Sequence, residues 1–526
     1  MSCKENNTES ELKNLISANV KLIQIISYET KRIHAMLIRA SEELEKPLFV
    51  WNRIEGLKKW DRDEWNFEQV DDGDFENPDD VIDYFNEHDD LVLLLEDFYP
   101  DLTEDKPRMI KNFRNIALKD SKNKTLVLSQ PFPQLPKELE KDVHIIELPY
   151  PDFEDVKAIY KTVCGEYGIN KDDEPDSELI EAALGLTIME AEKAFSLAYI
   201  ENGQLTGAEV PLVIREKENV IKKSGYLEYY HPKETMSDVG GLENLKNWLK
   251  KRGRGFDKGA KDFGLTYPKG ILLLGIPGTG KSLTAKAVGN LWNFPLLRLD
   301  MGKIFGGIVG ESENNIREAL KIAEAIAPSI LWIDEIEKGM SGISSSGSSD
   351  GGTTARVLGT FLTWMQEKTK PVFVVATAND ISQLPPELLR KGRVDEIFFV
   401  DLPSEKERKE IIEIHLRRKR RDPEDFDTLQ LAKESKGFSG AELEEAVKEA
   451  LFQAYDDEKE VTTEHISAAI KKTYPLSSTM HETINKMRQW AKSRAVAASE
   501  EEPEKLDNQN KDVPKLKQET YNNPFI

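Results

Sequence analysis

Short apolar runs alternate with amphipathic, helix-like stretches along most of the 526-residue chain. This alternation is typical of an α/β fold, in which helices connect the buried strands of a parallel sheet. In the second half the predicted strands are ILLLG (271–275), PLLRLD (295–300), SILWIDE (329–335), PVFVVAT (371–377) and EIFFVD (396–401). In the first half they are KLIQIIS (21–27), PLFVWN (47–52), LVLLLED (91–97), TLVLSQ (125–130) and VHIIEL (143–148). The pattern therefore predicts five strands in each half, in the same order.

The two halves also share local sequence in matching order. The matching pairs are QLPKEL (134–139) with QLPPEL (383–388), ELPYPDFEDVKAI (147–159) with DLPSEKERKEI (401–411), and GLTIMEAEKAFSLAY (185–199) with GFSGAELEEAVKEALFQAY (437–455). Two unrelated α/β domains with chance similarity are the alternative. Because three matches occur in register, we expect an internal duplication.

The stretch GIPGTGKS (275–282) follows a predicted strand and opens the predicted helix KSLTAKAVGNLW. It fits the phosphate-binding pattern G-x-x-x-x-G-K-[ST], in which glycines let backbone N–H groups point at phosphate and the helix N-terminus adds positive charge. Lys281 would reach the β- and γ-phosphates of ATP, and the Ser282 hydroxyl would bind Mg²⁺. A glycine-rich turn with a chance lysine is the alternative, but the flanking strand and helix argue against it. The predicted ATP-binding residues here are Gly275, Pro277, Gly278, Thr279, Gly280, Lys281, Ser282 and Leu283.

Polar side chains follow two of the strands in the same half. Asp334 ends the run SILWIDE and would hold hydrated Mg²⁺, while Glu335 would polarise the attacking water as a general base. An acidic strand end alone is common in structural roles, but here it accompanies a phosphate loop. Asn379 follows the next strand and would orient the water or the γ-phosphate.

Arg390 and Arg393 lie in LLRKGRVD (388–395), just before the last predicted strand. In one interpretation they are solvated charges on a turn. In the other they are arginine fingers that reach a phosphate bound by a neighbouring subunit. Because such fingers act across an interface, the second interpretation requires an oligomer.

Together these segments resemble the AAA family of ATPases within the AAA+ class. The resemblance extends from about Met236 to Tyr474 and also rests on MSDVGGLENLK (236–246), GGIVGESENNIREAL (306–320) and GFSGAELEEA (437–446). It implies a doubly wound α/β nucleotide-binding domain with a small helical lid. It further implies ATP with Mg²⁺ and a ring, usually a homo-hexamer.

The resemblance also assigns residues outside the phosphate loop. By matching position, the backbone at Val239 and Gly240 would border the adenine, and His415 would contact the nucleoside from the lid. Taken alone, His415 also fits an ordinary half-buried helix residue. Gly440 and Ala441 begin the lid segment near the nucleotide, and Ala441 stands where many AAA+ relatives, though not the AAA branch, carry an arginine.

One position departs from relatives that thread polypeptides through a central pore. Those relatives carry an aromatic residue before Val-Gly-Glu-Ser-Glu, where this chain has Ile308. Phe305 is either a substitute or a buried helix residue. The threading of a polypeptide is therefore left open, whereas the residues for ATP hydrolysis are all present.

The first half lacks the equivalent chemistry. The segment that matches the phosphate loop, IISYETKRI (25–33), contains no glycine, so its backbone cannot wrap closely around a triphosphate. Leu95-Glu96-Asp97 lies where the magnesium strand should end. Seven residues (140–146) replace the twelve (389–400) that hold both candidate finger arginines. We therefore expect a degenerate AAA-like α/β domain without catalysis.

This layout, followed by TYPLSSTMHETINKMRQWAKSRAVAAS (473–499), resembles the AAA proteins encoded in algal plastid genomes and found in cyanobacteria. The predicted domain organisation is a flexible N-terminus (1–14), a degenerate AAA-like domain (15–200), a linker (201–235), an AAA large α/β subdomain (236–403), a helical lid (404–474), a C-terminal helix (475–497) and a disordered tail (498–526). The run GISSSGSSDGGTT (342–354) predicts a mobile loop.

Composition narrows the class of protein further. The net charge of −23 argues weakly against broad binding to nucleic acids or anionic membranes, which need basic surface. The two cysteines, Cys3 and Cys164, cannot form a disulfide framework and suit a reducing compartment. The N-terminus has no apolar signal core, and no stretch approaches the roughly 18 apolar residues of a membrane span. We expect a cytoplasmic protein, or a stromal one if it is encoded in a plastid.

Three functions fit these features. The first is a Mg·ATP-driven ring, a homo-hexamer or another ring, that remodels a protein client or a complex. The second is a nucleic-acid-dependent ATPase that uses RRKRR (417–421), for which a solvated helix end is the simpler interpretation. The third is a nucleotide-gated assembly adaptor with slow turnover, against which Glu335, Asn379 and the two arginines argue, because a pure switch needs no hydrolytic residues.

Overall fold

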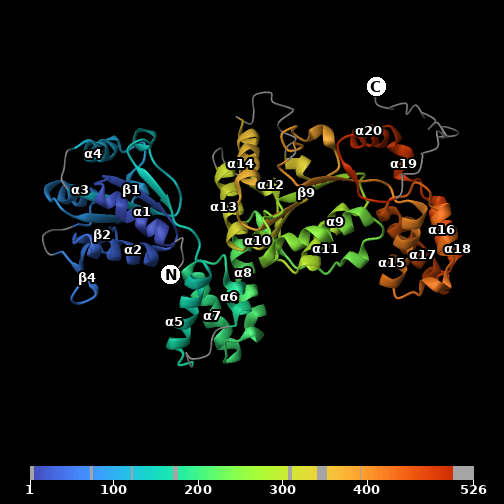
Figure 1. The fold of residues 1–526 in the computed structure, drawn as a ribbon, viewed down its shortest axis with the longest axis horizontal. Coiled ribbons are helices and arrows are strands. Elements are labelled where there is room, and N and C mark those ends of the chain that lie inside the picture. The colour runs from blue at the N-terminus through green and yellow to red at the C-terminus, as the bar shows by residue number, and fades with distance from the viewer. Residues whose placement is uncertain are drawn as a thin grey trace, which may run out of the picture. The chain divides into compact units, whose positions relative to one another are not determined.

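The computed structural model of the protein describes residues 5–70, 75–119, 123–169, 176–305, 311–339, 352–390 and 392–500. The chain forms two compact units, Met1–Val220 and Ile221–Ile526, and the division falls within one helix. Figure 1 shows each unit as a sheet flanked by helices together with a separate group of helices.

The N-terminal unit contains a seven-stranded sheet of order β4-β3-β2-β5-β6-β1-β7. Five strands are parallel, and β3 and β4 form an antiparallel ribbon at one edge. The strands are β1 (Leu22–Ile26), β2 (Leu48–Asn52), β3 (Gly56–Asp61), β4 (Asn66–Gln69), β5 (Val92–Glu96), β6 (Thr125–Gln130) and β7 (His144–Glu147). The helices around this sheet are α1 (Glu5–Ser17), α2 (Thr30–Glu43), α3 (Pro78–Glu87) and α4 (Pro107–Leu118).

Helices cover both faces of this sheet, because its central strands β1, β5 and β6 are mostly apolar and are buried along almost their whole length. In β5, Val92 and Leu94 pack with α1 and α2, whereas Leu93 and Leu95 pack with α3 and α4. Alternate strand residues point to opposite faces, so a continuous apolar run is what a sheet covered on both sides requires.

Four helices with a core of their own complete the N-terminal unit. They are α5 (Phe153–Glu166), α6 (Ser177–Ala183), α7 (Ile188–Asn202) and α8 (Val210–Lys223). Both α5 and α7 begin with a capping box, in which the N-cap side chain and the third helical residue satisfy each other's backbone N–H groups.

The C-terminal unit contains a second seven-stranded sheet, of order β14-β13-β9-β12-β11-β10-β8. Strands β9 to β14 are parallel, and β8 pairs antiparallel with β10 at one edge. The strands are β8 (Leu227–Tyr230), β9 (Gly270–Gly275), β10 (Leu296–Leu299), β11 (Ser329–Ile333), β12 (Val372–Ala378), β13 (Glu396–Val400) and β14 (Val496–Ala497). Its helices are α9 (Glu243–Gly253), α10 (Lys258–Asp262), α11 (Lys281–Trp292), α12 (Met301–Ile304), α13 (Glu311–Ala325) and α14 (Thr353–Glu367).

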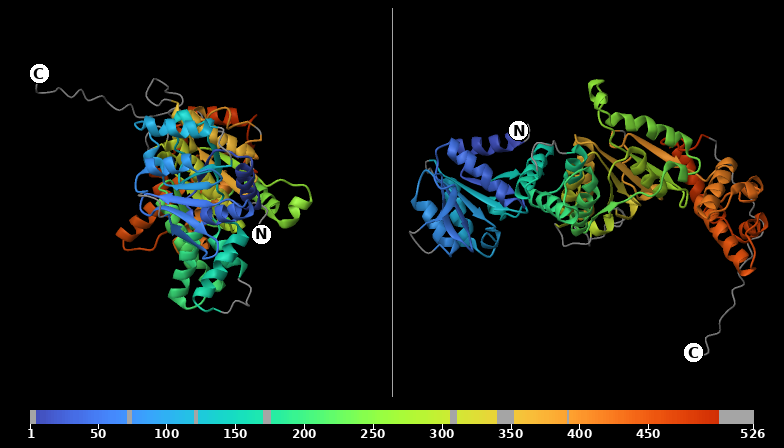
Figure 2. Two further views of the ribbon diagram at one scale, coloured as in Figure 1. Left: turned by 90° about the vertical axis from the view of Figure 1, so that its left-hand side faces the viewer. Right: turned by 90° about the horizontal axis from the view of Figure 1, so that it is seen from below.

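One face of this sheet packs on α9 and α11, and the other packs on α13 and α14. A helical lid follows, formed by α15 (Glu405–Arg418), α16 (Thr428–Glu434), α17 (Gly440–Asp456) and α18 (Thr463–Lys472). Figure 2 shows these lid helices in orange to red as a bundle distinct from the sheet. Helices α19 (Leu476–Thr479) and α20 (His481–Ala491) then lead back to β14 at the edge of the sheet.

The two units repeat one topology. Across the sheet, the five predicted strands of the N-terminal unit lie side by side in the order β2-β5-β6-β1-β7. Those of the C-terminal unit lie in the order β10-β11-β12-β9-β13. Both arrangements place the first strand between the fourth and the fifth. Each sheet is followed by four helices, and the third of these carries a capping box in both units. The predicted α/β fold class is confirmed, and the shared order supports a duplication.

Three predicted boundaries differ from the structure. Residues 5–14 are not a flexible segment but part of α1, which buries Leu12 against the sheet. Most of the predicted linker is regular structure, because α8 completes the helical core and β8 pairs with β10. The predicted tail begins too early, since Ala498 is fully buried and its N–H donates to the Phe399 carbonyl. Ile308, most of the glycine–serine run and residues 501–526 lie outside the described residues.

Candidate functional site

The predicted phosphate loop connects the buried strand β9 to α11. Gly278 and Gly280 have φ angles of +77° and +90°, in the left-handed region that favours glycine. A Cβ atom at Gly278 would lie 2.9 Å from Ser439 Oγ and 3.1 Å from Ala441 Cβ. The loop therefore needs glycine both for its turn and for its close contact with the lid.

Lys281, at the start of α11, is buried inside this loop. Its Nζ donates hydrogen bonds to the carbonyls of Gly275 at 2.9 Å and Ile276 at 2.7 Å. Burial lowers the pKa of the Lys281 amine to about 8, and the carboxylates of Glu337, Asp334 and Glu335 oppose this shift. The amine is thus a poorly solvated cation, and an incoming phosphate oxygen would replace its carbonyl partners.

Ser282 and Asp334 meet across the end of the sheet. Ser282 Oγ donates to Asp334 Oδ1 at 2.7 Å, and Thr377 Oγ1 donates to the same oxygen at 2.7 Å. Hydroxyl and carboxylate oxygens are the ligands that Mg²⁺ takes, usually one or two from the protein with the rest from phosphate and water. This pair fits a magnesium ion that is shared with a triphosphate.

Glu335 is held by two neighbours at the same edge. Asn379 Nδ2 donates to Glu335 Oε1 at 3.0 Å, and Lys338 forms an ion pair with the other carboxylate oxygen. The Glu335 backbone has a φ of +48°, and its N–H donates to Thr377 Oγ1 at 2.9 Å. The structure thus brings together the two side chains that the sequence predicted to handle water.

Glu337 lies behind this pair in a 3₁₀ turn (Ile336–Gly339) and is a residue that sequence reasoning missed. Its Oε1 accepts a hydrogen bond from the backbone N–H of Asn379 at 2.9 Å. Its Oε2 is buried and has no hydrogen-bond partner among the described residues. Burial raises the pKa of the Glu337 carboxyl. Glu337 therefore positions Asn379.

The predicted adenine-side segment packs on the first lid helix, α15. Val239 is buried, and a Cβ atom at Gly240 would lie 2.6 Å from Ile411 Cγ1. His415 is one turn beyond Ile411 on the same helix. Burial lowers the pKa of the His415 ring, and the Glu444 carboxylate opposes the shift. The structure therefore brings both residues predicted to lie near the adenine and its nucleoside, Gly240 and His415, to the same helix, α15.

Glu407 joins this region to the end of the described chain. Its Oε1 accepts hydrogen bonds from the Leu242 N–H at 3.1 Å and from Ser499 Oγ at 2.6 Å. Its Oε2 accepts from the Ser404 N–H at 2.9 Å in the capping box of α15. The capping pattern S-x-x-E is visible in the sequence, but the two distant partners are not.

The lid also touches the phosphate loop at the start of α17. The Ala441 N–H donates to the Gly278 carbonyl at 3.0 Å, and Gly440 is the first residue of the helix. Ser439 and Glu442 form the capping box that holds this turn. Gly440 and Ala441, which the sequence placed in the lid segment, therefore lie beside the phosphate loop.

The two candidate finger arginines have different environments. Arg393 is half-buried, and its Nη1 donates to the Leu362 carbonyl of α14 at 2.6 Å. The Arg390 side chain is exposed and makes no hydrogen bond or ion pair with the described part of the chain, although its backbone N–H donates to the Glu387 carbonyl at 3.4 Å. The Arg390 side chain is therefore open to solvent, whereas Arg393 ties its loop to α14.

Thr377 is the other functional neighbour that the sequence did not reveal. It binds both Asp334 and the Glu335 backbone from strand β12, two residues before Asn379. Its position in the strand, on the same face as Asn379, was the available signal.

Among the described residues, no helix combines the length and the apolar character that crossing a bilayer requires.

Four family models match segments of this chain. The family model described as "ATPase family associated with various cellular activities (AAA)" matches residues 271–402, and the AAA+ lid domain matches residues 425–468. The N-terminal domain and the second domain of SpoVK-like AAA ATPases match residues 8–148 and 154–224.

Relatives extend the match over nearly the whole chain. The AAA domain-containing protein ycf46 of Guillardia theta is 38% identical over 492 residues, which cover 92% of this chain and 95% of the relative. The ycf46 protein of Pyropia yezoensis is 42% identical over 402 residues, covering 76% and 81%. A cell division cycle protein 48 homolog of Archaeoglobus fulgidus is 32% identical over 304 residues, covering 55% and 40%. Both resemblances inferred from the sequence are confirmed, and the chain belongs to the AAA ATPase family and, within it, to the ycf46 AAA domain-containing proteins.

Proposed function

We propose that the C-terminal unit binds Mg·ATP and hydrolyses it, and that a ring of subunits uses this hydrolysis to remodel a protein or a macromolecular complex. The contact between Asn379 Nδ2 and Glu335 Oε1, at 3.0 Å, carries the hydrolytic part of this proposal. A protein that only bound nucleotide would have no use for a carboxylate oriented by an amide at this edge. The Ser282–Asp334 contact at 2.7 Å lies at the same edge.

Each residue has a distinct role in the proposed reaction. The backbone of residues 278–282 and the Lys281 amine bind the phosphates of the substrate. Ser282 and Asp334 hold Mg²⁺, which when bound neutralises phosphate charge. Glu335 Oε1 accepts a proton from the attacking water, and Asn379 keeps that oxygen oriented. General-base assistance of this kind contributes about 10²–10⁴ in rate.

The exposed Arg390 supports assembly into a ring. An arginine supplied by a neighbouring subunit stabilises charge on the transferred phosphoryl group, which is an effect of about 10³–10⁵ in kcat. A homo-hexamer or another closed ring gives every site one such neighbour. In this proposal Arg393 is not a finger but holds the loop before β13 to α14.

The alternative of a nucleic-acid-dependent ATPase has less support. Three arginines of the basic cluster 417–421 form ion pairs with acidic residues of their own unit. These pairs are Arg417 with Glu413, Arg418 with Asp238 and Arg421 with Glu460. Paired guanidinium groups are less available to phosphodiesters than free ones.

The proposed function is tested with the Glu335→Gln variant, which keeps the shape of the side chain. Wild-type protein should turn over ATP, and the variant should retain ATP binding and assembly while turnover falls by about 10²-fold or more. Protein copurified with the ATP-bound variant from its native host would identify the client. Equal turnover by the two proteins would refute the assignment of the base.

A further inference from the structure

The loop between β1 and α2 occupies, in the N-terminal unit, the topological position of the phosphate loop. Three residues (27–29) separate this strand from its helix, whereas five (276–280) separate β9 from α11. The short loop contains no glycine and ends in Glu29, whose side chain is 6% exposed. A buried carboxylate is costly unless strong partners compensate for its lost hydration.

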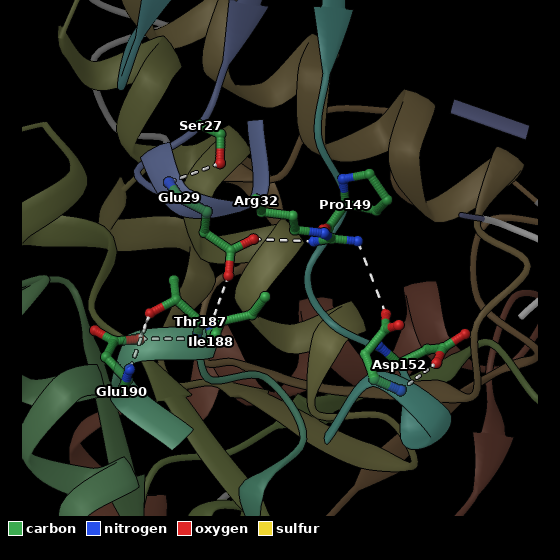
Figure 3. A network of polar contacts seen from close by, with 9 residues as sticks. Ser27, Glu29, Arg32, Pro149, Asp152, Thr187, Ile188 and Glu190 are labelled. Carbon is green, nitrogen blue, oxygen red and sulfur yellow. Dashed lines mark hydrogen bonds and ion pairs between the residues drawn. The ribbon is translucent and has the colours of Figure 1, made fainter. Parts of the chain in front are cut away.

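Two groups provide this compensation, as Figure 3 shows. Arg32 Nη1 donates to Glu29 Oε2 at 2.9 Å. The backbone N–H of Ile188 donates to Glu29 Oε1 at 2.6 Å. The Glu29 N–H donates to Ser27 Oγ at 3.0 Å and shapes the loop. The carboxylate therefore joins the start of α2 to a residue 159 positions further along the chain.

Arg32 extends this network to the segment that leads into α5. Its side chain is buried, and its Nη1 also donates to the Pro149 carbonyl at 2.5 Å. Its Nη2 lies 3.8 Å from Asp155 Oδ2, within the capping box of α5. The Arg32 guanidinium thus links the loop after β1, through Glu29, to the start of α5, through Asp155.

Ile188 is the first residue of α7, which is capped by Thr187 and Glu190. The aligned motifs GLTIME and GFSGAE match Ile188 with Gly440, at the start of the lid helix that touches the phosphate loop of the C-terminal unit. A helix N-terminus and a guanidinium are the two kinds of group that bind phosphate most readily. In the N-terminal unit both converge on one side chain of the protein.

We propose that Glu29 is an internal substitute for a phosphate group. Its carboxylate fills an anion site formed by Arg32 and the start of α7, and it holds the helices α5–α8 against the sheet without any nucleotide. The N-terminal unit therefore holds this arrangement with its own side chains and needs no bound ligand. This inference does not rest on the proposed ATP hydrolysis.

Removing the carboxylate should expose a vacant anion site. In full-length Glu29→Ala, Arg32 and the Ile188 N–H lose their partner, so amide hydrogen exchange in the first turn of α7 should speed up by about 10- to 100-fold. Millimolar inorganic phosphate should reverse this increase in Glu29→Ala and leave the wild-type rate unchanged. The double variant Glu29→Ala/Arg32→Met is the matched control, because it should not respond to phosphate.

Two results would overturn the proposal. One is unchanged exchange of α7 in Glu29→Ala, and the other is an equal effect of phosphate on wild type, the single variant and the double variant. If Glu29→Ala does not fold, Glu29→Gln replaces it, because the amide oxygen can still accept from Ile188 while Arg32 loses its nearest counter-charge and keeps the more distant Asp155. Exchange at α7 must then exceed the wild-type rate, and a wild-type rate would contradict the role of the charge. ATP turnover is not a readout, so the inference and the proposed hydrolysis fail separately.

Discussion

The two sheets place acidic residues at the same point but surround them with different partners. In the C-terminal unit, Asp334 follows β11 and meets Ser282 and Thr377. In the N-terminal unit, β5 ends in Glu96, whose oxygens lie 2.7 Å from His34 Nε2 and 3.0 Å from Asn52 Nδ2. The first carboxylate is paired with hydroxyls that suit a metal, and the second is held by two polar side chains of its own domain.

The backbone after these acids is nevertheless the same. Glu335 and Asp97 have φ angles of +48° and +47°. The Glu335 N–H donates to Thr377 Oγ1 and the Asp97 N–H donates to the Ser129 carbonyl, both at 2.9 Å and both on the neighbouring strand. Such a conformation is uncommon for residues other than glycine. The comparison teaches that this turn belongs to the fold, whereas the proposed catalysis depends on the side chains that surround it.

The largest difference should appear at the finger position, which the N-terminal unit lacks. Arg390→Ala should lower ATP turnover by about 10³–10⁵ because no neighbour then neutralises the transferred phosphoryl group. Steady-state turnover at saturating ATP measures this loss. Arg393→Ala is the matched control. It should instead lower the free energy of unfolding by about 1–2 kcal/mol through the lost hydrogen bond to the Leu362 carbonyl. The reverse outcome would exchange the roles of the two arginines.

The equivalent acids give the next largest effect. Glu335→Gln should reduce turnover by about 10²–10⁴, because the carboxylate that accepts the water proton is removed. Asp97→Asn, at the same backbone position of the N-terminal sheet, should leave turnover unchanged. A large loss of turnover in Asp97→Asn would show that the N-terminal unit takes part in catalysis.

A buried lysine should make the free energy of unfolding of the N-terminal unit depend on pH. Lys217 is buried, its Nζ donates to the Ala182 carbonyl at 3.0 Å, and burial lowers its pKa to about 7. Above pH 7 and up to about 10.5 the unfolded chain keeps a proton that the folded chain has lost, so this group makes the free energy of unfolding rise with pH.

Lys217→Met should remove that dependence. Below pH 7 the variant should be more stable than wild type by on the order of 5 kcal/mol, and the gain should fade as the pH rises toward 10. Hydrogen exchange of α6 and α8 at several pH values measures the effect. A constant difference between the two proteins at all pH values would mean that packing, rather than charge, explains it.

The smallest expected effect is a change in ATP affinity, and it distinguishes two matching capping residues, Glu407 and Asp155. Glu407→Gln should weaken ATP binding by about 10-fold, because the Leu242 N–H beside the adenine-side segment loses a charged acceptor. Asp155→Asn changes the matching capping residue of α5, which bonds the Asp152 N–H at 3.0 Å. It should leave ATP affinity unchanged. Equilibrium binding of a fluorescent ATP analogue distinguishes the two, and equal weakening by both would remove the special role of Glu407.

The sequence predicted the ten central strands because their apolar runs are long and are bounded by turns. It missed β8 and β14, since β8 has only four residues and β14 only two, and each depends on pairing with a distant strand. It also missed β3 and β4, which are mostly exposed and contain no long apolar run. It also missed α1, which rests on a few apolar residues such as Leu12 and Ile16 in a polar stretch. Edge strands and terminal helices are stabilised by tertiary contacts that local patterns do not contain.

The candidate site was predictable to the same extent. Lys281, Ser282, Asp334, Glu335 and Asn379 follow motif spacing and meet in the structure. Arg390 and Arg393 looked equivalent in sequence, because only the fold shows which of them faces a carbonyl of its own subunit. Glu29 resembled an ordinary acid before a helix, and its contact with Ile188 required the folded chain.

The central claim is that one sheet binds nucleotide while the other uses its own carboxylate. Its most direct test is the number of nucleotides bound per full-length chain, measured by equilibrium dialysis with labelled ATP and Mg²⁺ on the Glu335→Gln variant. The account predicts about one nucleotide per chain, and none when Lys281→Ala is added, because only one phosphate loop is present. Two nucleotides per chain, or binding that survives Lys281→Ala and is lost with Arg32→Met, would contradict it.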